Sequence, residues 1–95
     1  MFYNCSSLTS LDISHFDTSN LVMAEGLFDG CSSLTSLNLS NFDTSKVTQM
    51  NNMFRDCISL SSLDLSNFDT SKVINIDNMF SGCNNLEYIN IKNLL

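Results

Sequence analysis

Apolar residues return at fixed intervals along the whole chain, and the most regular of them form the pattern L-x-x-L-x-L. In one copy this pattern consists of Leu60, Leu63 and Leu65. In an extended segment Leu63 and Leu65 point to the same side, because successive side chains alternate between two faces. The same alternating pair occurs in four places: Leu11/Ile13, Leu37/Leu39, Leu63/Leu65 and Ile89/Ile91. The pattern predicts one short strand per copy, with the aliphatic side chains stacked inside a parallel sheet.

The residues after each strand predict a short helix on the back of the copy. A phenylalanine first continues the inward set: Phe16, Phe42 and Phe68, with Leu94 in the corresponding place of the fourth copy. Asp-Thr-Ser follows in the three complete copies, and these residue types favour helix N-caps. Val47, Met50 and Phe54 come next at spacings of three and four, which suits one or two helical turns. Polar pairs then turn the chain back toward the next strand: Tyr3-Asn4, Asp29-Gly30, Arg55-Asp56 and Ser81-Gly82.

These elements belong to a repeat of 26 residues without insertion or deletion. The copies are residues 1–26, 27–52 and 53–78, with a partial fourth at 79–95, and the second and third are identical at 16 of 26 positions. A fixed period of this size is typical of a solenoid, in which each copy forms one coil and stacks only on its neighbours. The predicted fold is therefore an α/β solenoid, with one short parallel strand and one short helical turn per coil.

The repeat also predicts how the chain is organised. Residues 1–95 form a single domain without a marked linker, since the chain has no proline and only three glycines. Met1-Phe2 corresponds to Met53-Phe54, and the sequence stops about midway through a coil. We therefore expect a fragment of a longer array. Each terminal coil would expose an apolar edge, including Leu94 and Leu95 at one end, and such edges favour end-to-end association of copies.

Charge and hydropathy exclude several classes of partner. The net charge is −6, and the four basic residues do not cluster in the sequence. Nucleic acid and anionic membrane surfaces are therefore not expected as partners. No apolar run approaches the roughly 18 residues of a membrane span. The chain also begins directly on repeat sequence without a secretory signal, which fits either a cytoplasmic chain or a piece of a longer exported protein.

The full repeat motif resembles that of a known family. The segment from Met53 to Val73 reads M-F-x-x-C-x-x-L-x-x-L-x-L-S-N-F-D-T-S-K-V. This motif is similar to the repeat of the BspA-like family of leucine-rich repeat surface proteins, and the resemblance covers nearly the whole chain. It implies an exported or surface-anchored protein, located at the cell surface or outside the cell. It also implies adhesion to host matrix proteins or to other cells as the role.

The outward side chains of the predicted strands are the candidate binding surface. They form three columns: Ser10/Ser36/Ser62/Tyr88, Asp12/Asn38/Asp64/Asn90 and Ser14/Ser40/Ser66/Lys92. In leucine-rich repeats the corresponding face often binds protein, so the predicted ligand surface is centred on Asp12, Asn38, Asp64 and Tyr88. The alternative is a solvated face that only keeps the sheet soluble, because aromatic and arginine side chains, which dominate binding hot spots, are absent there except for Tyr88.

Two further columns could carry chemistry. Cys5, Cys31, Cys57 and Cys83 lie at intervals of 26, and the interpretation we favour is a row of buried free thiols that pack as small hydrophobes. Disulfides between adjacent coils and a metal site are the alternatives, although one column of sulfurs offers poor tetrahedral geometry for zinc. The column Asp17/Asp43/Asp69 could bind calcium, but aspartate before Thr-Ser is also a ready cap for the following turn, and capping is favoured.

Catalysis has little support in the sequence. His15 is the only histidine, and asparagine takes its place at Asn41 and Asn67. The many serines are repeat positions without a matching base. We therefore expect no enzymatic activity, no cofactor and no metal. Two functional hypotheses are left: a surface protein that binds a host matrix or cell-surface protein, and a structural spacer with no ligand of its own.

Overall fold

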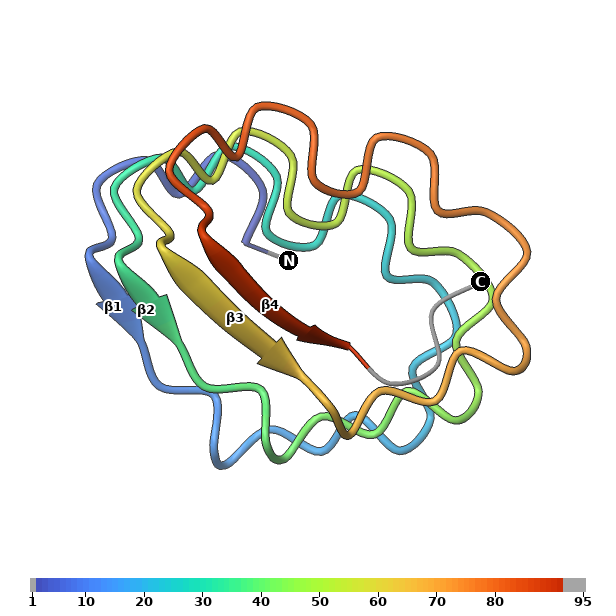
Figure 1. Ribbon diagram of the computed structural model, residues 1–95. Helices are drawn as coiled ribbons and strands as arrows, with labels where there is room; N and C mark the ends of the chain where they lie inside the picture. Colours follow the sequence, from blue (N-terminus) through green and yellow to red (C-terminus); the bar gives the residue numbers. More distant parts are fainter. Residues whose placement is uncertain (1, 92–95) are drawn as a thin grey trace.

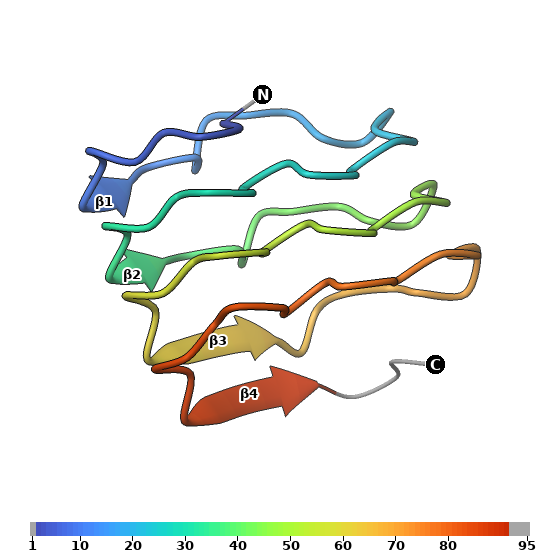
Figure 2. The same cartoon turned by 90° about the horizontal axis from the view of Figure 1, so that it is seen from above.

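The computed structural model describes residues 2–91, and the side chains of residues 2–89. Each 26-residue copy forms one coil, and successive coils lie one above the other (Figures 1 and 2). Every coil contributes one strand on the same side of the stack, and each strand lies at an L-x-L segment or directly before it. The strands are β1 (Ser10–Leu11), β2 (Ser36–Leu37), β3 (Ser62–Leu65) and β4 (Tyr88–Ile91).

The strands pair in parallel with an offset of one full repeat. Ser10 lies opposite Ser36 in the pair β1–β2, and Ser62 lies opposite Tyr88 in the pair β3–β4. These pairs make two separate two-stranded sheets, so the ladder is interrupted between β2 and β3. On the inner side the alternation places leucines in the core: Leu39, Leu63 and Leu65 are each 2% exposed. The sheet is therefore parallel and in register, but it is not continuous.

The short helix expected on the back of each coil does not form in residues 2–91, and that prediction is wrong there. The back is built from hydrogen bonds between coils, in which every second N–H donates to the carbonyl 25 residues ahead. Ala24 donates to Gln49 at 2.9 Å, Phe28 to Met53 at 2.9 Å and Met50 to Asn75 at 2.9 Å. These N–H groups donate to the neighbouring coil, so they do not form the i→i−4 hydrogen bonds of an α-helix.

Left-handed residues explain why the back cannot be helical. Positive φ occurs in two columns, Gly26/Asn52/Asn78 and Asn4/Gly30/Asp56/Gly82. The two columns are four residues apart, so a left-handed residue lies two positions before and two positions after each of Phe28, Phe54 and Phe80. Only glycine, asparagine and aspartate occupy these positions, and they are the residue types that adopt this conformation most readily. The back of each coil is therefore a series of tight turns.

The core consists of columns of identical or similar side chains. Phe2, Phe28, Phe54 and Phe80 stack with ring centroids 5.6, 5.6 and 5.8 Å apart and nearly parallel planes. Phe28 and Phe54 in the two middle coils are fully buried, whereas Phe2 and Phe80 in the terminal coils are only partly buried. Burial therefore depends on having a coil on both sides, as expected for a stack in which each unit contacts only its neighbours.

Polar side chains also join neighbouring coils. The Thr44 hydroxyl accepts a hydrogen bond from the Asp69 N–H at 2.8 Å and donates to the Asp69 carbonyl at 3.1 Å. Arg55 reaches the buried Asp29 with two contacts, Nη2 to Oδ2 at 2.8 Å and Nε to Oδ1 at 3.1 Å. Both pairs cross one coil boundary, so polar columns as well as apolar ones fix the stacking register. The predictions made for Lys92, Leu94 and Leu95 lie outside the described residues.

Candidate functional site

The outward side chains of the strands and of the residues that follow them form one surface, which is exposed except at the half-buried Ser66. We call it the strand face: Ser10, Asp12, Ser14, Ser36, Asn38, Ser40, Ser62, Asp64, Ser66 and Tyr88. The predicted site residues Asp12, Asn38 and Asp64 occupy equivalent places in three successive coils. Each is exposed. The structure therefore places the three in a single column.

The column residues are held in one orientation by their own backbone. The N–H of Ser14 donates to Asp12 Oδ1 at 3.0 Å, that of Ser40 to Asn38 Oδ1 at 3.0 Å, and that of Ser66 to Asp64 Oδ1 at 2.9 Å. This bond from the residue two positions on is an Asx turn, which ends the strand. Aspartate and asparagine make it equally well, so an acidic and a neutral residue exchange in this column without a change of geometry.

These turns also set the charge of the face. Hydrogen bonding with the Ser66 side chain, and then with its N–H, lowers the pKa of Asp64 from its ordinary value of 3.8. The Ser14 side chain and N–H lower the pKa of Asp12 in the same way. Both carboxylates are therefore ionised at neutral pH, and the strand face carries negative charge.

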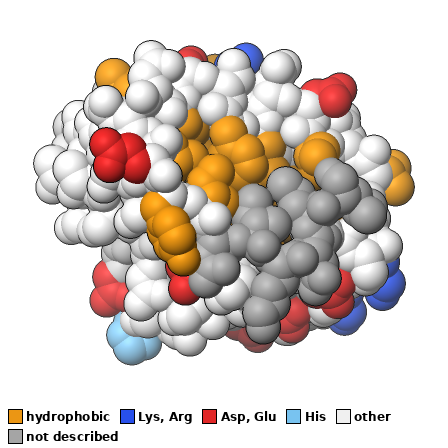
Figure 3. Space-filling view, in the orientation of Figure 1, with side chains coloured by type: hydrophobic (Ala, Val, Ile, Leu, Met, Phe, Trp, Pro, Cys, Tyr) orange, Lys and Arg blue, Asp and Glu red, His pale blue; other side chains and the backbone are white. Residues whose placement is uncertain are grey.

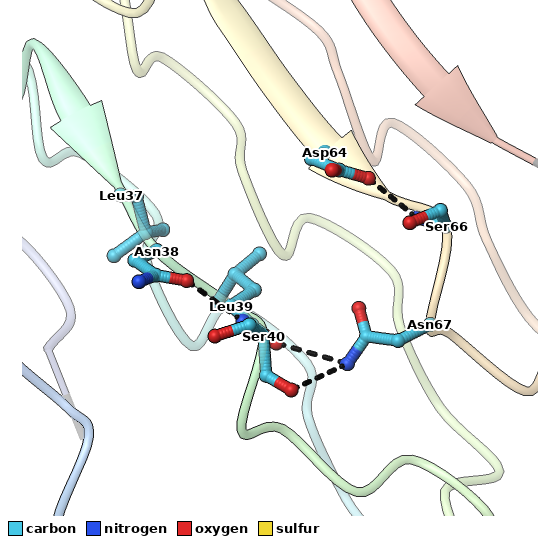
Figure 4. A pocket seen from close by; sticks show the side chains of 7 residues that line it. All are labelled: Leu37, Asn38, Leu39, Ser40, Asp64, Ser66 and Asn67. Carbon is cyan, nitrogen blue, oxygen red and sulfur yellow. Dashed lines mark hydrogen bonds between the residues drawn. The ribbon is translucent and has the colours of Figure 1, made fainter.

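A hollow opens in the strand face where the ladder is interrupted. It has a volume of about 130 Å³ and lies between β2 and β3 (Figure 4). Its lining comes from both coils: Leu37, Asn38, Leu39, Ser40, Asp64, Ser66 and Asn67. Two of the predicted site residues, Asn38 and Asp64, thus meet at one hollow. Asp12 lies one coil away beside Asn38, and Tyr88, which is 60% exposed, lies on β4 outside the lining.

Asn67 joins the two coils on either side of the interruption. Its Nδ2 donates to three carbonyls of the preceding coil, those of Leu39 at 3.0 Å, Ser40 at 3.2 Å and Phe42 at 3.1 Å. From the sequence, this position is considered only as the place that asparagine takes instead of His15, and no role is predicted for the asparagine. The sequence contained a sign of this role, because asparagine occupies the same place in two successive copies, at Asn41 and Asn67. In the structure the Asn41 Nδ2 also donates to a carbonyl of the preceding coil, that of Ser14, at 2.8 Å.

The cysteine column packs inside the stack. The thiol of Cys31 donates to the Phe2 carbonyl at 3.1 Å, that of Cys57 to Phe28 at 3.1 Å and that of Cys83 to Phe54 at 3.0 Å. All four cysteines are free in this structure. Burial raises the pKa of the Cys57 thiol to about 12, and the neighbouring thiols add to the shift. The column is therefore the row of free thiols that the sequence favours, but only Cys31 and Cys57 are buried, whereas Cys5 and Cys83 are half-buried.

The second aspartate column closes turns. The N–H of Ser19 donates to Asp17 Oδ1, that of Ser45 to Asp43 Oδ1 and that of Ser71 to Asp69 Oδ1, each at 3.0 Å. These carboxylates cap the turn that follows them, as favoured from the sequence. Across residues 2–91, no group of three or more His, Cys, Asp and Glu side chains is arranged to hold a metal ion. The same residues include no helix long and apolar enough to span a membrane.

Comparison with known proteins places the chain in a sequence family. The sequence model of the family described as "Mycoplasma protein of unknown function, DUF285" matches residues 1–94. A search of curated proteins and a search of solved structures gave no match. The family description names no activity, so the function has to be argued from the strand face.

Proposed function

We propose that this chain, which belongs to the DUF285 family, is a non-catalytic leucine-rich repeat surface protein that binds other proteins through its strand face. The partner class is a protein of the host extracellular matrix or of a cell surface, and the location is the cell surface or the exterior. The resemblance of the 26-residue motif to the BspA-like family of leucine-rich repeat surface proteins supports these assignments. The stacked coils with one strand each fit a leucine-rich solenoid whose back is formed by turns.

One observation carries the proposal: the exposed side chains of the strand face are fixed before any ligand arrives. Asp12, Asn38 and Asp64 each accept a hydrogen bond from their own turn at about 3 Å, and the turns are attached to coils that are bonded to one another. A surface ordered in this way loses little conformational entropy when it binds, which favours affinity. Tyr88 adds an exposed aromatic side chain on the same face, of the kind enriched in binding hot spots.

The test is saturable binding of the chain to immobilised fibronectin, collagen and laminin, measured by surface plasmon resonance. One variant carries Asp12→Lys, Asp64→Lys and Tyr88→Ala on the strand face. The matched control carries Glu25→Lys and Asp77→Lys, which reverse two exposed charges in one column of the back. Binding should be lost in the strand-face variant and kept in the control. Equal binding by both variants would show that the strand face is not responsible.

The second candidate function is a structural spacer, and it has an observation in its favour. The oxygens of Asp12, Asn38 and Asp64 already bond to their own backbone, so these residues have a structural role without any ligand. A spacer predicts no saturable binding to any of the three matrix proteins. That result would contradict the adhesion proposal and leave the spacer as the explanation.

A second copy of this chain is a further proposed partner. Figure 3 looks along the stack at the end that carries β4, and apolar side chains gather in the upper centre of this end. In the last coil the equivalents of buried core residues are only partly buried: Phe80, Cys83, Leu86 and Ile89. These rows have the same spacing as the rows that stack between interior coils, so another coil of the same type is the surface that fits them.

A further inference from the structure

The hollow in the strand face exists at one particular coil junction. At the junction β3–β4 the strands are paired over four residues, and at β1–β2 they are paired over two, Ser10–Leu11 with Ser36–Leu37. At the junction of β2 and β3 the strands belong to different sheets, and the space between them is the hollow of about 130 Å³. A water molecule takes up roughly 30 Å³ of liquid, so a small polar group can enter together with a few waters.

The polar atoms at this hollow are mostly hydrogen-bond acceptors. Asp64 contributes a carboxylate, and it is the only charged residue in the lining. Asn67 uses its Nδ2 on three backbone carbonyls, so its Oδ1 is left to accept. Figure 4 shows the amide oxygen of Asn38 on the side of Ser40 and its nitrogen on the opposite side. A group that donates hydrogen bonds therefore fits this hollow, and a positive charge favours it.

The arrangement distinguishes between the two common basic side chains. A guanidinium binds a carboxylate best through both oxygens at once. Asp64 Oδ1 already accepts the Ser66 N–H at 2.9 Å, so a planar arginine fork that spans both oxygens has to share Oδ1 with that N–H. An ammonium group has three donors that point in different directions. It can use one carboxylate oxygen together with acceptors on other residues, and Leu37 and Leu39 offer apolar surface for the aliphatic stem.

We propose that the hollow between β2 and β3 receives a lysine side chain of the protein partner. That the lysine belongs to a protein partner rests on the function proposed above, whereas recognition of the ammonium group depends only on the hollow. In this arrangement Asp64 provides the charge, and Asn67 Oδ1 and the Ser66 hydroxyl provide neutral acceptors. Asn38 shapes the opposite wall.

Two isosteric substitutions separate the hollow from the general charge of the face. Asp64→Asn and Asp12→Asn each remove one negative charge from the same column. Both should keep the fold, because Asn38 makes the same turn with its amide oxygen at 3.0 Å. Only Asp64 lines the hollow, so Asp12→Asn is the matched control. Circular dichroism and the melting temperature of each variant check that the structure is unchanged.

The probe is N-acetyl-lysine methylamide, titrated into the ¹⁵N-labelled chain at millimolar concentrations and followed by NMR. The corresponding arginine and norleucine compounds serve as comparison probes. The lysine probe should shift the amide signals of residues 37–40 and 64–67. Asp64→Asn should weaken its binding about fivefold, the size of an exposed ion pair worth about 1 kcal/mol. Asp12→Asn should weaken binding less than half as much.

Several results would overturn the lysine assignment. Equal weakening by both substitutions would show that the probe responds to overall charge. Binding of the arginine or norleucine probe as strong as that of lysine would rule out recognition of the ammonium group, and signal shifts elsewhere would place the site outside the hollow. If a matrix protein still binds Asp64→Asn at full strength, the hollow is not its docking point, yet the adhesion proposal stands. If the lysine probe binds but no matrix protein does, the adhesion proposal fails alone.

Discussion

Replacing Phe54 by leucine should destabilise the protein more than the same replacement of Phe80. Phe54 is fully buried and has stacked rings on both sides, Phe28 at 5.6 Å and Phe80 at 5.8 Å. Phe80 is partly buried and stacks on Phe54 alone among the described residues. The two sites have the same chemistry and the same place in the repeat. They differ in having a neighbouring coil on two sides or on one.

The magnitude follows from the number of ring pairs that are lost. An aromatic pair contributes about 0.5–1.5 kcal/mol beyond the burial of its area. Phe54→Leu removes two pairs and should cost roughly 1–3 kcal/mol from this source, whereas Phe80→Leu removes one pair and should cost about half as much. A 95-residue chain has a total stability on the order of 5–14 kcal/mol, so both variants should stay folded. Leucine is preferred to alanine for this reason.

The assay is urea unfolding followed by circular dichroism, with the free energy of unfolding extrapolated to water. The double variant supplies a second check, because the Phe54–Phe80 contact is lost in both single variants and would be counted twice in their sum. The double variant should therefore be less destabilised than that sum by about 0.5–1.5 kcal/mol. The reasoning is refuted if Phe80→Leu costs as much as Phe54→Leu, or if the two losses are strictly additive.

Three other predictions follow from the turns, the thiols and the ends of the stack. Gly82→Ala should cost about 1–3 kcal/mol in urea unfolding, because φ is +78° and a Cβ would overlap the Asp56 carboxyl oxygen. Gly26→Asn should leave the free energy of unfolding nearly unchanged, because asparagine occupies this column in the next two coils. If Gly26→Asn cost as much stability as Gly82→Ala, the account of the turns would be contradicted. The Cys57 pKa is raised from 9.0 to about 12, so the thiol loses its proton at lower pH in the unfolded chain than in the folded one, and its contribution to stability is lost as pH rises from 9.0 to about 12. In Cys57→Ala the free energy of unfolding should therefore fall less over this pH range. An identical pH profile for the two proteins would disprove this role of the thiol. Light scattering should show the mean mass rising with concentration through end-to-end association, and a constant monomer mass at high concentration would exclude it.

The alternating leucines predict the positions of the strands and the packed columns because both depend on a local pattern. Leu63 and Leu65 are buried as their spacing requires, and the exposure of Asp64 between them follows from the same alternation. The column of Asp12, Asn38 and Asp64 on the strand face was therefore accessible from the sequence. The sequence could not show that only Asn38 and Asp64 meet at the hollow, because this depends on where the strand ladder is interrupted.

In residues 2–91 no helix forms on the back, and the sequence contains a sign of this that the apolar spacing conceals. Val47, Met50 and Phe54 have helical spacing, but Asn52 lies among them with φ of +59°. The same column contains glycine at Gly26 and asparagine at Asn78, which together indicate a left-handed turn in every copy. The competing interaction was also non-local. An N–H that can bond to the next coil does not need an intrahelical partner, and no window of one copy reveals that neighbour.

The hydrogen bonds between coils are the feature on which the whole account depends, and NMR can detect them directly. Scalar couplings across hydrogen bonds connect a backbone nitrogen to the carbonyl carbon that accepts its proton. We predict couplings from the Phe28 nitrogen to the Met53 carbonyl and from the Phe54 nitrogen to the Met79 carbonyl, for contacts of 2.9 and 3.0 Å. Couplings from these nitrogens to carbonyls four residues earlier in the chain would instead show helices on the back, and the stacked arrangement described above would be wrong.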